Sequence, residues 1–319
     1  MSASLFGCAE ALEAMHVPYQ VISEDTLSDE AKLRPFSVII LGMASCLSNE
    51  QVSCIRNFAK RGGTVILGPK VATKDHWGHP RTEWPLKDVF GFTLITKNTA
   101  PGTAVAAVVN KRNITFARPL KCHVPISAKG GRMSGWDWQL QMNGEKNTPL
   151  AYECASGKGR FVYVPVSLAT HLYNEDFNGM PNPKFVLDTK AETVFHRILK
   201  RVLKNSDNPI RTDAPPKVHL TLYRQDNALY LHLLNGLGAA RPTQDSLHTP
   251  MEKLFPQLPQ DIGFSLHSPG TVMVYAVSPD FPGRRELAFN LRDDGSISFT
   301  LPAKLLKVYT IIKIQQSGR

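Results

Sequence analysis

Two continuous apolar runs separated by one amphipathic segment constrain the first half of this chain more than any other feature. The runs are Phe36–Gly42 and Thr64–Gly68, and uninterrupted apolar stretches of this kind are typical of parallel strands buried on both faces. Between them, Ser48 and Gln51 have the spacing of a capping box, which predicts a helix that ends at the glycine pair Gly62-Gly63. This strand–helix–strand unit predicts an α/β sheet.

The period of the apolar pattern changes after a segment rich in proline and turn-forming residues, Asn205–Pro216. Before this segment we also expect a helix ending near His16, strands at 19–22, 92–95, 105–109 and 160–164, and a closing helix over 191–203. After it, alternating residues predict a hairpin of 218–223 and 229–234, followed by strands at 261–266, 272–276, 286–291, 296–301 and 307–314. The sequence therefore predicts a flavodoxin-like α/β domain over residues 1–208 and an antiparallel β-sandwich domain over residues 209–319.

Composition excludes several classes of protein. The 37 Lys and Arg residues against 27 Asp and Glu residues give a net charge of +10, but the densest basic stretch, 196–204, has apolar residues at helical spacing and no nucleic-acid-binding motif beside it. The sequence has no apolar run of 18 residues and no secretory leader, so we expect a cytoplasmic protein without a membrane partner. The five cysteines form no Cys-x-x-Cys pair, so we expect buried thiols and no structural metal.

One polar and aromatic cluster follows the second buried run. It comprises Asp75, His76, Trp77 and His79, and it lies beyond the carboxyl end of a strand, where open α/β sheets bind their ligands. A loop offers no fixed geometry for three metal ligands, so we expect contact with a ligand or a partner rather than a metal. Trp136 and Trp138 are the second candidate contact, because their rings could stack on a sugar or pack within the domain.

No complete catalytic set is recognisable in the sequence. The turn after the second run, Gly68-Pro69-Lys70, has no nucleophile, whereas Cys46 precedes the predicted helix and could be activated by its amino end. Glu175-Asp176 and Asp137 are carboxylates without a defined separation. His219 and His232 are expected to face each other across the predicted hairpin on its solvent side. We predict no catalytic residue and no cofactor.

Several short segments resemble one family of glycosidases. The chain is similar to the glutamine-amidotransferase-like domain, also called the trimerisation domain, and the terminal β-domain of β-galactosidases in glycoside hydrolase family forty-two. The matching segments are Val38–Leu41, Cys46–Gln51, Phe58–Val65, Trp77–Arg81, Leu86–Gly91, Gly157–Pro165 and Leu229–Asn235.

The resemblance implies a non-catalytic role. In that family a (β/α)₈ barrel precedes these domains and carries both catalytic glutamates, so none of its catalytic residues maps onto this chain. The resemblance implies a region that supports homo-oligomerisation or that shapes the active-site mouth of an attached or separate barrel. It also implies a strand before the first helix, whose loss would expose an apolar sheet edge or leave a central strand without its neighbour. The alternatives are an amidase or hydrolase that uses Cys46, and a carbohydrate-binding module whose platform is the tryptophan pair or a face of the sandwich.

Overall fold

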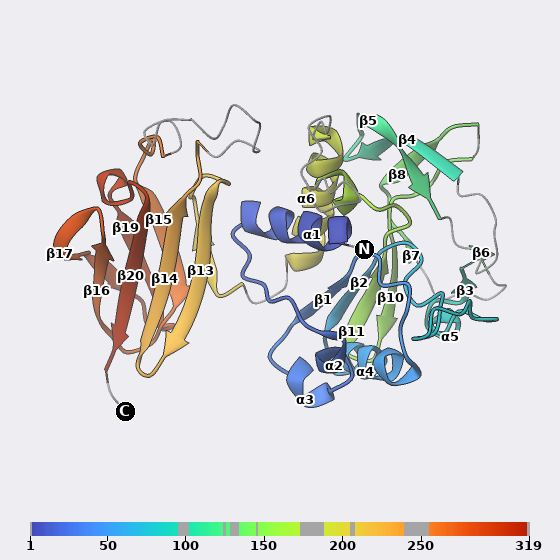
Figure 1. Cartoon of the computed structure of the whole chain (residues 1–319), viewed down its shortest axis with the longest axis horizontal. Coiled ribbons are helices and arrows are strands. Elements are labelled where there is room, and N and C mark those ends of the chain that lie inside the picture. The colour runs from blue at the N-terminus through green and yellow to red at the C-terminus, as the bar shows by residue number, and fades with distance from the viewer. Residues whose placement is uncertain are drawn as a thin grey trace. The chain divides into compact units, whose positions relative to one another are not determined.

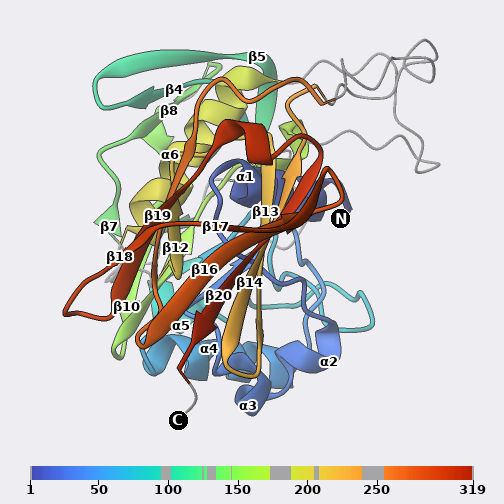
Figure 2. The same ribbon diagram turned by 90° about the vertical axis from the view of Figure 1, so that its left-hand side faces the viewer.

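The computed structural model describes residues 2–94, 102–123, 126–127, 134–144, 146–172, 188–204, 208–238 and 255–317 (Figures 1 and 2). The fold is mixed α/β with several antiparallel sheets. The chain divides into two compact units: unit 1 comprises Met1–Ala11 and Val21–Ser206, and unit 2 comprises Leu12–Gln20 and Asp207–Arg319. No helix within the described ranges is long and apolar enough to cross a membrane.

A five-stranded sheet with the order β1-β2-β11-β10-β7 organises unit 1. Its strands are β1 (Val38–Leu41), β2 (Thr64–Leu67), β11 (Gly159–Tyr163), β10 (Tyr152–Ser156) and β7 (Ser134–Gly135). The first three are parallel, β10 pairs antiparallel with β11, and β7 pairs antiparallel with β10 at the edge of the sheet. The two apolar runs predicted as buried strands are thus β1 and β2. They pair directly with each other in parallel register.

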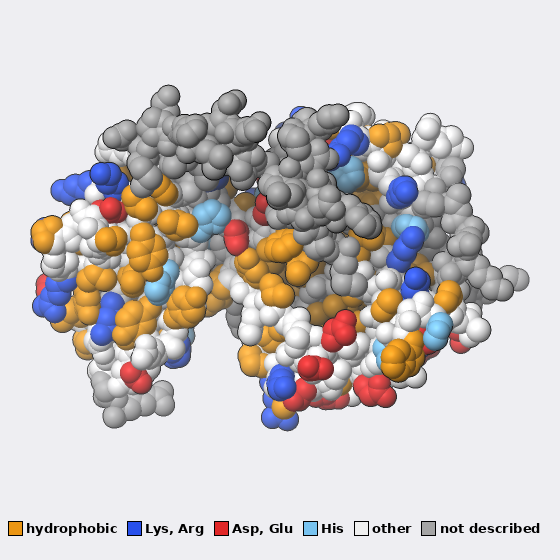
Figure 3. Space-filling model, in the orientation of Figure 1, with side chains coloured by type: hydrophobic (Ala, Val, Ile, Leu, Met, Phe, Trp, Pro, Cys, Tyr) orange, Lys and Arg blue, Asp and Glu red, His pale blue; other side chains and the backbone are white. Residues whose placement is uncertain are grey.

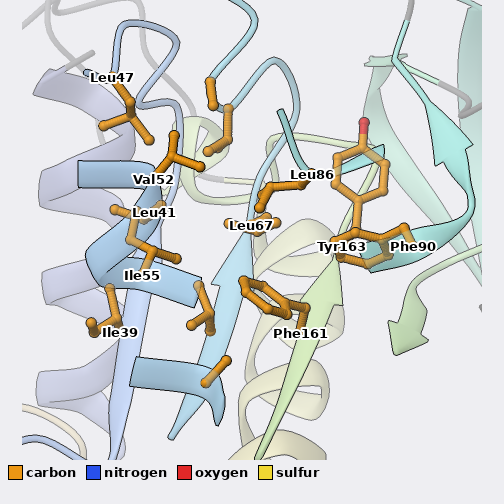
Figure 4. Packing of buried hydrophobic residues seen from close by; sticks show 14 of the residues in the cluster. Ile39, Leu41, Leu47, Val52, Ile55, Leu67, Leu86, Phe90, Phe161 and Tyr163 are labelled. Carbon is orange, nitrogen blue, oxygen red and sulfur yellow. The ribbon is translucent and has the colours of Figure 1, made fainter. Parts of the chain in front are cut away.

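Helices cover both faces of this sheet. Helix α4 (Asn49–Lys60) packs Val52 and Ile55 against Ile39, Leu41 and Phe161 on one face (Figure 4). Helices α1 (Ser2–Ala14) and α6 (Thr189–Leu203) lie behind the sheet in the same view. Burial on both faces explains why these strands are continuously apolar.

The rest of unit 1 is more strand-rich than the sequence predicts. A four-stranded antiparallel sheet has the order β5-β4-β8-β9, and β3 pairs with β6. Two of these strands, β3 (Phe92–Thr93) and β4 (Gly102–Val109), correspond to the strands predicted at 92–95 and 105–109. The strands that the sequence did not predict here are β5 (Arg112–Cys122), β6 (Ile126–Ser127), β8 (Gln139–Met142) and β9 (Thr148–Pro149). The added helical turns are α2 (Glu24–Leu27), α3 (Glu30–Leu33), α5 (Lys87–Phe90) and η1 (Ala169–His171).

The strand expected at residues 19–22 is absent from the structure. Tyr19 and Val21 lie in a connection without regular structure, and both side chains are exposed. Four alternating residues are a weak signal for a strand when no neighbouring strand pairs with them. Of the predicted linker, residues 205–207 lie outside the described residues.

Unit 2 consists of two antiparallel sheets with one shared core (Figure 2). One sheet has the order β12-β15-β19-β18 and the other has the order β13-β14-β20-β16-β17. The elements are β12 (Ile210–Thr212), β13 (Val218–Gln225), β14 (Ala228–Asn235), β15 (Ile262–His267), β16 (Thr271–Ser278), β17 (Phe281–Glu286), β18 (Phe289–Leu291), β19 (Ser296–Leu301), η3 (Ala303–Leu305) and β20 (Tyr309–Gln316). The predicted hairpin is β13–β14, whereas the single strand expected at 286–291 is divided between β17 and β18.

The register of β13 and β14 corrects one expectation. His219 pairs with Leu234 and His232 pairs with Thr221, so the two histidines are diagonal neighbours rather than directly opposite. The inward residues of the hairpin, such as Leu231, are fully buried in the shared core. The outward residues include both histidines because side chains alternate between the two faces of a strand.

Residues 12–20 form hydrogen bonds with β13, the first strand of the hairpin in unit 2. The His16 ring hydrogen-bonds the Val218 carbonyl through Nε2 at 3.0 Å. Glu13 Oε2 lies 3.0 Å from His219 Nδ1, and Glu13 Oε1 accepts a 2.7 Å hydrogen bond from the Tyr19 hydroxyl. The bond to Glu13 raises the pKa of His219 although partial burial lowers it, and the same bond lowers the pKa of Glu13.

The capping box of α4 generates a prediction about unit 1. Ser48 accepts a hydrogen bond from the Gln51 amide, and the Gln51 side chain accepts one from the Ser48 amide. Ser48→Ala should therefore destabilise unit 1 by about 1 kcal/mol. Urea unfolding followed by tryptophan fluorescence measures this, because all four tryptophans belong to unit 1. Ser53→Ala, on the exposed surface of the same helix, is the control and should change stability far less; equal losses in both variants would contradict the prediction.

The Glu13–His219 pair generates a prediction about pH. Because the folded-state pKa of His219 is raised, its contribution to stability is complete below the unfolded pKa of about 6.5 and is lost as the pH rises through the folded value. The thermal midpoint of the wild type should therefore exceed that of His219→Gln by more at a pH of about 5.5 than at a pH of about 8.5. Burial is the largest cause of the lowered pKa of His16, and this part acts in the opposite direction in both proteins and cancels in the difference; only the smaller effect of the His219 charge on His16 is lost in the variant. A difference that does not change with pH would refute the role of the pair.

Candidate functional site at the carboxyl ends of the parallel strands

The loops that follow β1 and β2 leave the same edge of the sheet and are joined to each other. Leu41 pairs with Leu67, so the chain leaves both strands at the same level. The loops continue side by side: the Lys74 amide donates to the Ser45 carbonyl at 2.9 Å, and the Ala72 amide donates to the Ala44 carbonyl at 3.0 Å. This edge is where open α/β sheets place ligands.

Close backbone contact at the start of these loops requires glycine. A Cβ atom on Gly68 would lie 1.7 Å from the Gly42 carbonyl oxygen. Lys70 and Ala72 then adopt left-handed backbone conformations, with φ of 63° and 55°. Such conformations are costly for residues other than glycine, and they accumulate at functional sites.

The predicted cluster forms a compact turn over residues 75–79, which we call the Asp75 turn. Asp75 Oδ1 accepts hydrogen bonds from the amides of Trp77 at 3.0 Å and His79 at 2.9 Å, and Oδ2 lies 3.3 Å from His79 Nδ1. Gly78 closes the turn with a φ of 86°. Desolvation raises the pKa of Asp75, but these bonds outweigh it and the pKa is lowered. The carboxylate therefore holds the turn together.

The tip of the turn presents an aromatic side chain to solvent. Trp77 is 76% exposed, and its ring contacts the His76 ring at a centroid distance of 4.7 Å. Because an exposed tryptophan is unusual on a soluble surface, its position is consistent with a contact for a ligand or a partner. Asp75 is occupied by bonds within the turn, and the described residues contain no group of three or more metal-binding side chains.

Arg81 anchors the turn to the rest of the edge. Its guanidinium donates to the Leu47 carbonyl at 2.6 Å, to Asn49 Oδ1 at 2.9 Å and to the Lys74 carbonyl at 3.3 Å. The sequence did not single out Arg81, because two of its three acceptors lie more than 30 residues away in the chain. A lone arginine in a polar loop carries no local signal for such a role.

His123 is a second residue that the sequence did not reveal. Burial lowers its pKa to about 4, and the charges of Lys70 and Lys121 act in the same direction. Its carbonyl accepts a 2.8 Å hydrogen bond from the hydroxyl of the buried Tyr163, at the end of β11. The site edge therefore contains a neutral imidazole beside Lys70.

Trp136 and Trp138 do not belong to this edge. They are 4% and 7% exposed, and their rings meet edge to face at 5.4 Å. Arg201 of α6 covers both rings, at 4.2 Å and 5.0 Å from their centroids, and forms a 2.8 Å ion pair with Asp137. The expected sugar contact at these two residues would require this packing to open. Glu175 and Asp176 lie outside the described residues.

The cysteines divide into four buried thiols and one half-buried thiol, Cys46. Burial raises the pKa of Cys8 to about 12. Cys46 Sγ lies 3.8 Å from the Ser45 hydroxyl, and within the described ranges no histidine hydrogen-bonds it. Nothing in this geometry resembles a base-activated nucleophile.

A hollow of about 440 Å³ is lined by residues of α4, of α5 and of the segment before α5, and several of them are charged. Arg56 pairs with Asp88, and Lys87 pairs with Glu83. Because each of these four charges already has a partner of opposite sign, the hollow favours no charged ligand.

Solved structures resemble the whole chain in fold. An α-L-fucosidase isoenzyme from Paenibacillus thiaminolyticus matches 99% of this chain and 45% of its own, with a TM-score of 0.65 and 15% identity. A β-galactosidase from Bacillus circulans sp. alkalophilus matches 98% of this chain and 37% of its own (TM-score 0.59, 12% identity). A GH42 β-galactosidase from G. stearothermophilus matches 98% of this chain and 36% of its own chain, with a TM-score of 0.58 and 12% identity. The chain therefore spans less than half the length of these proteins. No protein-family model and no curated protein matches the sequence.

The Asp75 turn generates a prediction about its own rigidity. Asp75→Ala removes the acceptor for two backbone amides, so hydrogen exchange at the Trp77 and His79 amides should rise several-fold, since each lost bond costs about 1 kcal/mol. Asp75→Asn keeps one side-chain oxygen as an acceptor and is the matched control, with a smaller rise. Exchange rates measured by NMR that are equal in the wild type and Asp75→Ala would show that the carboxylate does not hold the turn.

Proposed function

We propose that this chain is a non-catalytic accessory region of a β-galactosidase-like glycoside hydrolase, with an amidotransferase-like, flavodoxin-like α/β unit followed by a β-sandwich. One observation carries the proposal: nearly the whole chain, through both units, superposes on part of a fucosidase and of GH42 β-galactosidases. Three parallel strands with helices on both faces support the flavodoxin-like assignment of unit 1.

The proposed role of unit 1 is to contact another folded body through the Asp75 turn. That body is a second copy of the chain or a (β/α)₈ barrel, either attached or separate. Trp77 projects from a turn that Asp75 and Arg81 hold in place, so little conformational entropy is lost when the ring is covered. Exposed tryptophans of this kind are typical centres of binding energy in interfaces.

The experiment isolates the protein from the cells that produce it. We expect either an intact mass above that of the 319-residue chain, because a barrel is attached, or co-purification of a separate barrel chain. The native assembly should cleave aryl-galactosides, and the 319-residue chain alone should not. Cleavage by the 319-residue chain that depends on its own carboxylates would refute the proposal.

A substitution in the Asp75 turn tests whether this turn forms the interface, independently of whether the chain has the accessory role. Trp77→Ala should weaken the assembly roughly 30-fold, the effect of losing about 2 kcal/mol at an interface centre, as measured by sedimentation. His76→Ala, which removes the neighbouring ring, is the matched control with a smaller effect. If the dissociation constant of Trp77→Ala equals that of the wild type, the Asp75 turn does not form the interface.

A further inference from the structure

One row of side chains crosses all five strands on the outward face of the β13–β17 sheet. In the register of the sheet, Tyr223 of β13 lies opposite Tyr230 of β14, and Tyr230 lies opposite Lys313 of β20. Lys313 lies opposite Tyr275 of β16, which in turn lies opposite Glu286 of β17. We call these five residues the cross-strand row.

Charged groups lie beside two of the three rings of the row, Tyr230 and Tyr275. Lys313 Nζ lies 5.5 Å from the Tyr230 ring centroid and 6.0 Å from the Tyr275 ring centroid. The Arg284 guanidinium lies 5.6 Å from the Tyr275 centroid and pairs with Glu286 at 3.1 Å. These are cation–π distances, so the cations hold the rings in position across the sheet.

The neighbouring positions add further polar and aromatic groups. His232 meets the Tyr223 ring at 4.9 Å, and its Nδ1 hydrogen-bonds the Tyr309 hydroxyl. Thr221 lies opposite His232, and Gln315 lies two residues beyond Lys313 on the same face. Hydrogen-bonding groups therefore border the rings on both sides of the row.

This face is open to solvent in part. Tyr223 is 56% exposed, and Tyr230, Tyr275 and Lys313 are half-buried. Figure 3 shows hydrophobic side chains gathered over the sheet, with histidine and basic side chains among them. The row is therefore a contiguous aromatic and charged surface that a ligand can reach from solvent.

The chemistry of the face selects the class of ligand. A pyranose ring has an apolar face of C–H groups that packs on an aromatic ring, and a rim of hydroxyls that needs donors and acceptors. The tyrosines supply the aromatic rings. The donors and acceptors come from Lys313, His232 and Gln315. A protein partner would bury the Lys313 ammonium at the centre of the face, where interfaces avoid lysine and an unpaired charge is costly. Nucleic acid would need more cations than Lys313 and Arg284, of which Arg284 is already paired.

We propose that the outward face of the β13–β17 sheet binds an extended, uncharged glycan along the cross-strand row. Tyr230 and Tyr275 are separated by two strand spacings, or about 9.6 Å, which suits two rings stacked at intervals along one chain. Lys313 and the flanking polar side chains would hydrogen-bond the hydroxyls between these rings. The site does not depend on the accessory role proposed above, and it requires neither a barrel nor an oligomer.

Affinity electrophoresis of the full chain tests the proposal, with soluble β-1,4-galactan, β-1,4-mannan or xyloglucan in the gel. We expect retardation by at least one polysaccharide. Tyr223→Ala combined with Tyr230→Ala should weaken that binding roughly tenfold or more, equivalent to about 1.4 kcal/mol. Phenylalanine at both positions keeps the rings and should retain most of the affinity. Leu291→Ala removes a side chain that is 50% exposed on the other sheet and should have no effect.

The outcomes are distinguishable from one another and from failure of the accessory role. Migration unaffected by all three polysaccharides would overturn the proposal, as would binding that survives the double alanine variant. If the double variant unfolds, by far-ultraviolet circular dichroism, Tyr223→Ala alone replaces it, because that ring is more than half exposed. Loss of a dimer in Tyr223→Ala without any glycan binding would assign the face to a second copy of the chain instead.

Discussion

The parallel pairing of β2 with β1 on one side and β11 on the other determines the rest of unit 1. It places the three strand ends at one edge, so the loops that follow β1 and β2 can hydrogen-bond to each other. It also brings backbones so close that a Cβ atom on Gly68 would clash with Gly42, and one on Gly159 would clash with Gly63. The sheet can therefore form only if positions 68 and 159 are glycine, because any larger residue would clash with the neighbouring backbone.

Unit 2 uses a different physical device, the alternation of side chains along antiparallel strands. Inward residues such as Leu231 and Ile312 fill the core between the two sheets. Outward residues on the same strands carry the tyrosines, histidines and Lys313. One set of strands therefore supplies both the folding energy of the unit and a chemically specific surface, and the two can vary separately because they share only the backbone.

Local signals predicted well wherever the partners are close in sequence. The capping box of Ser48 and Gln51, the hairpin of β13 and β14 and the glycine pair after α4 are each formed by residues that are close in the chain. The strand expected at 19–22 failed because a strand needs a partner that a short alternating segment does not specify. The role of Arg81 was missed for the same reason, since Leu47 accepts its hydrogen bond from a distant part of the chain. The sequence left open whether Trp136 packs within the domain, because Arg201 reaches it from a distant part of the chain.

The sequence by itself determined the two buried parallel strands, the helix between them, the change to period two after residue 208 and the Asp75–His79 cluster. Periodicity, capping and turn formation are properties of neighbouring residues, so they can be read before the chain folds. Only the tertiary structure decided that Trp77 is exposed while Trp136 and Trp138 are buried, and that Tyr223, Tyr230, Lys313, Tyr275 and Glu286 form one row. Burial and cross-strand register depend on which distant segments of the chain pair with each other. This pairing is determined by the free energy of the whole fold and not by neighbouring residues.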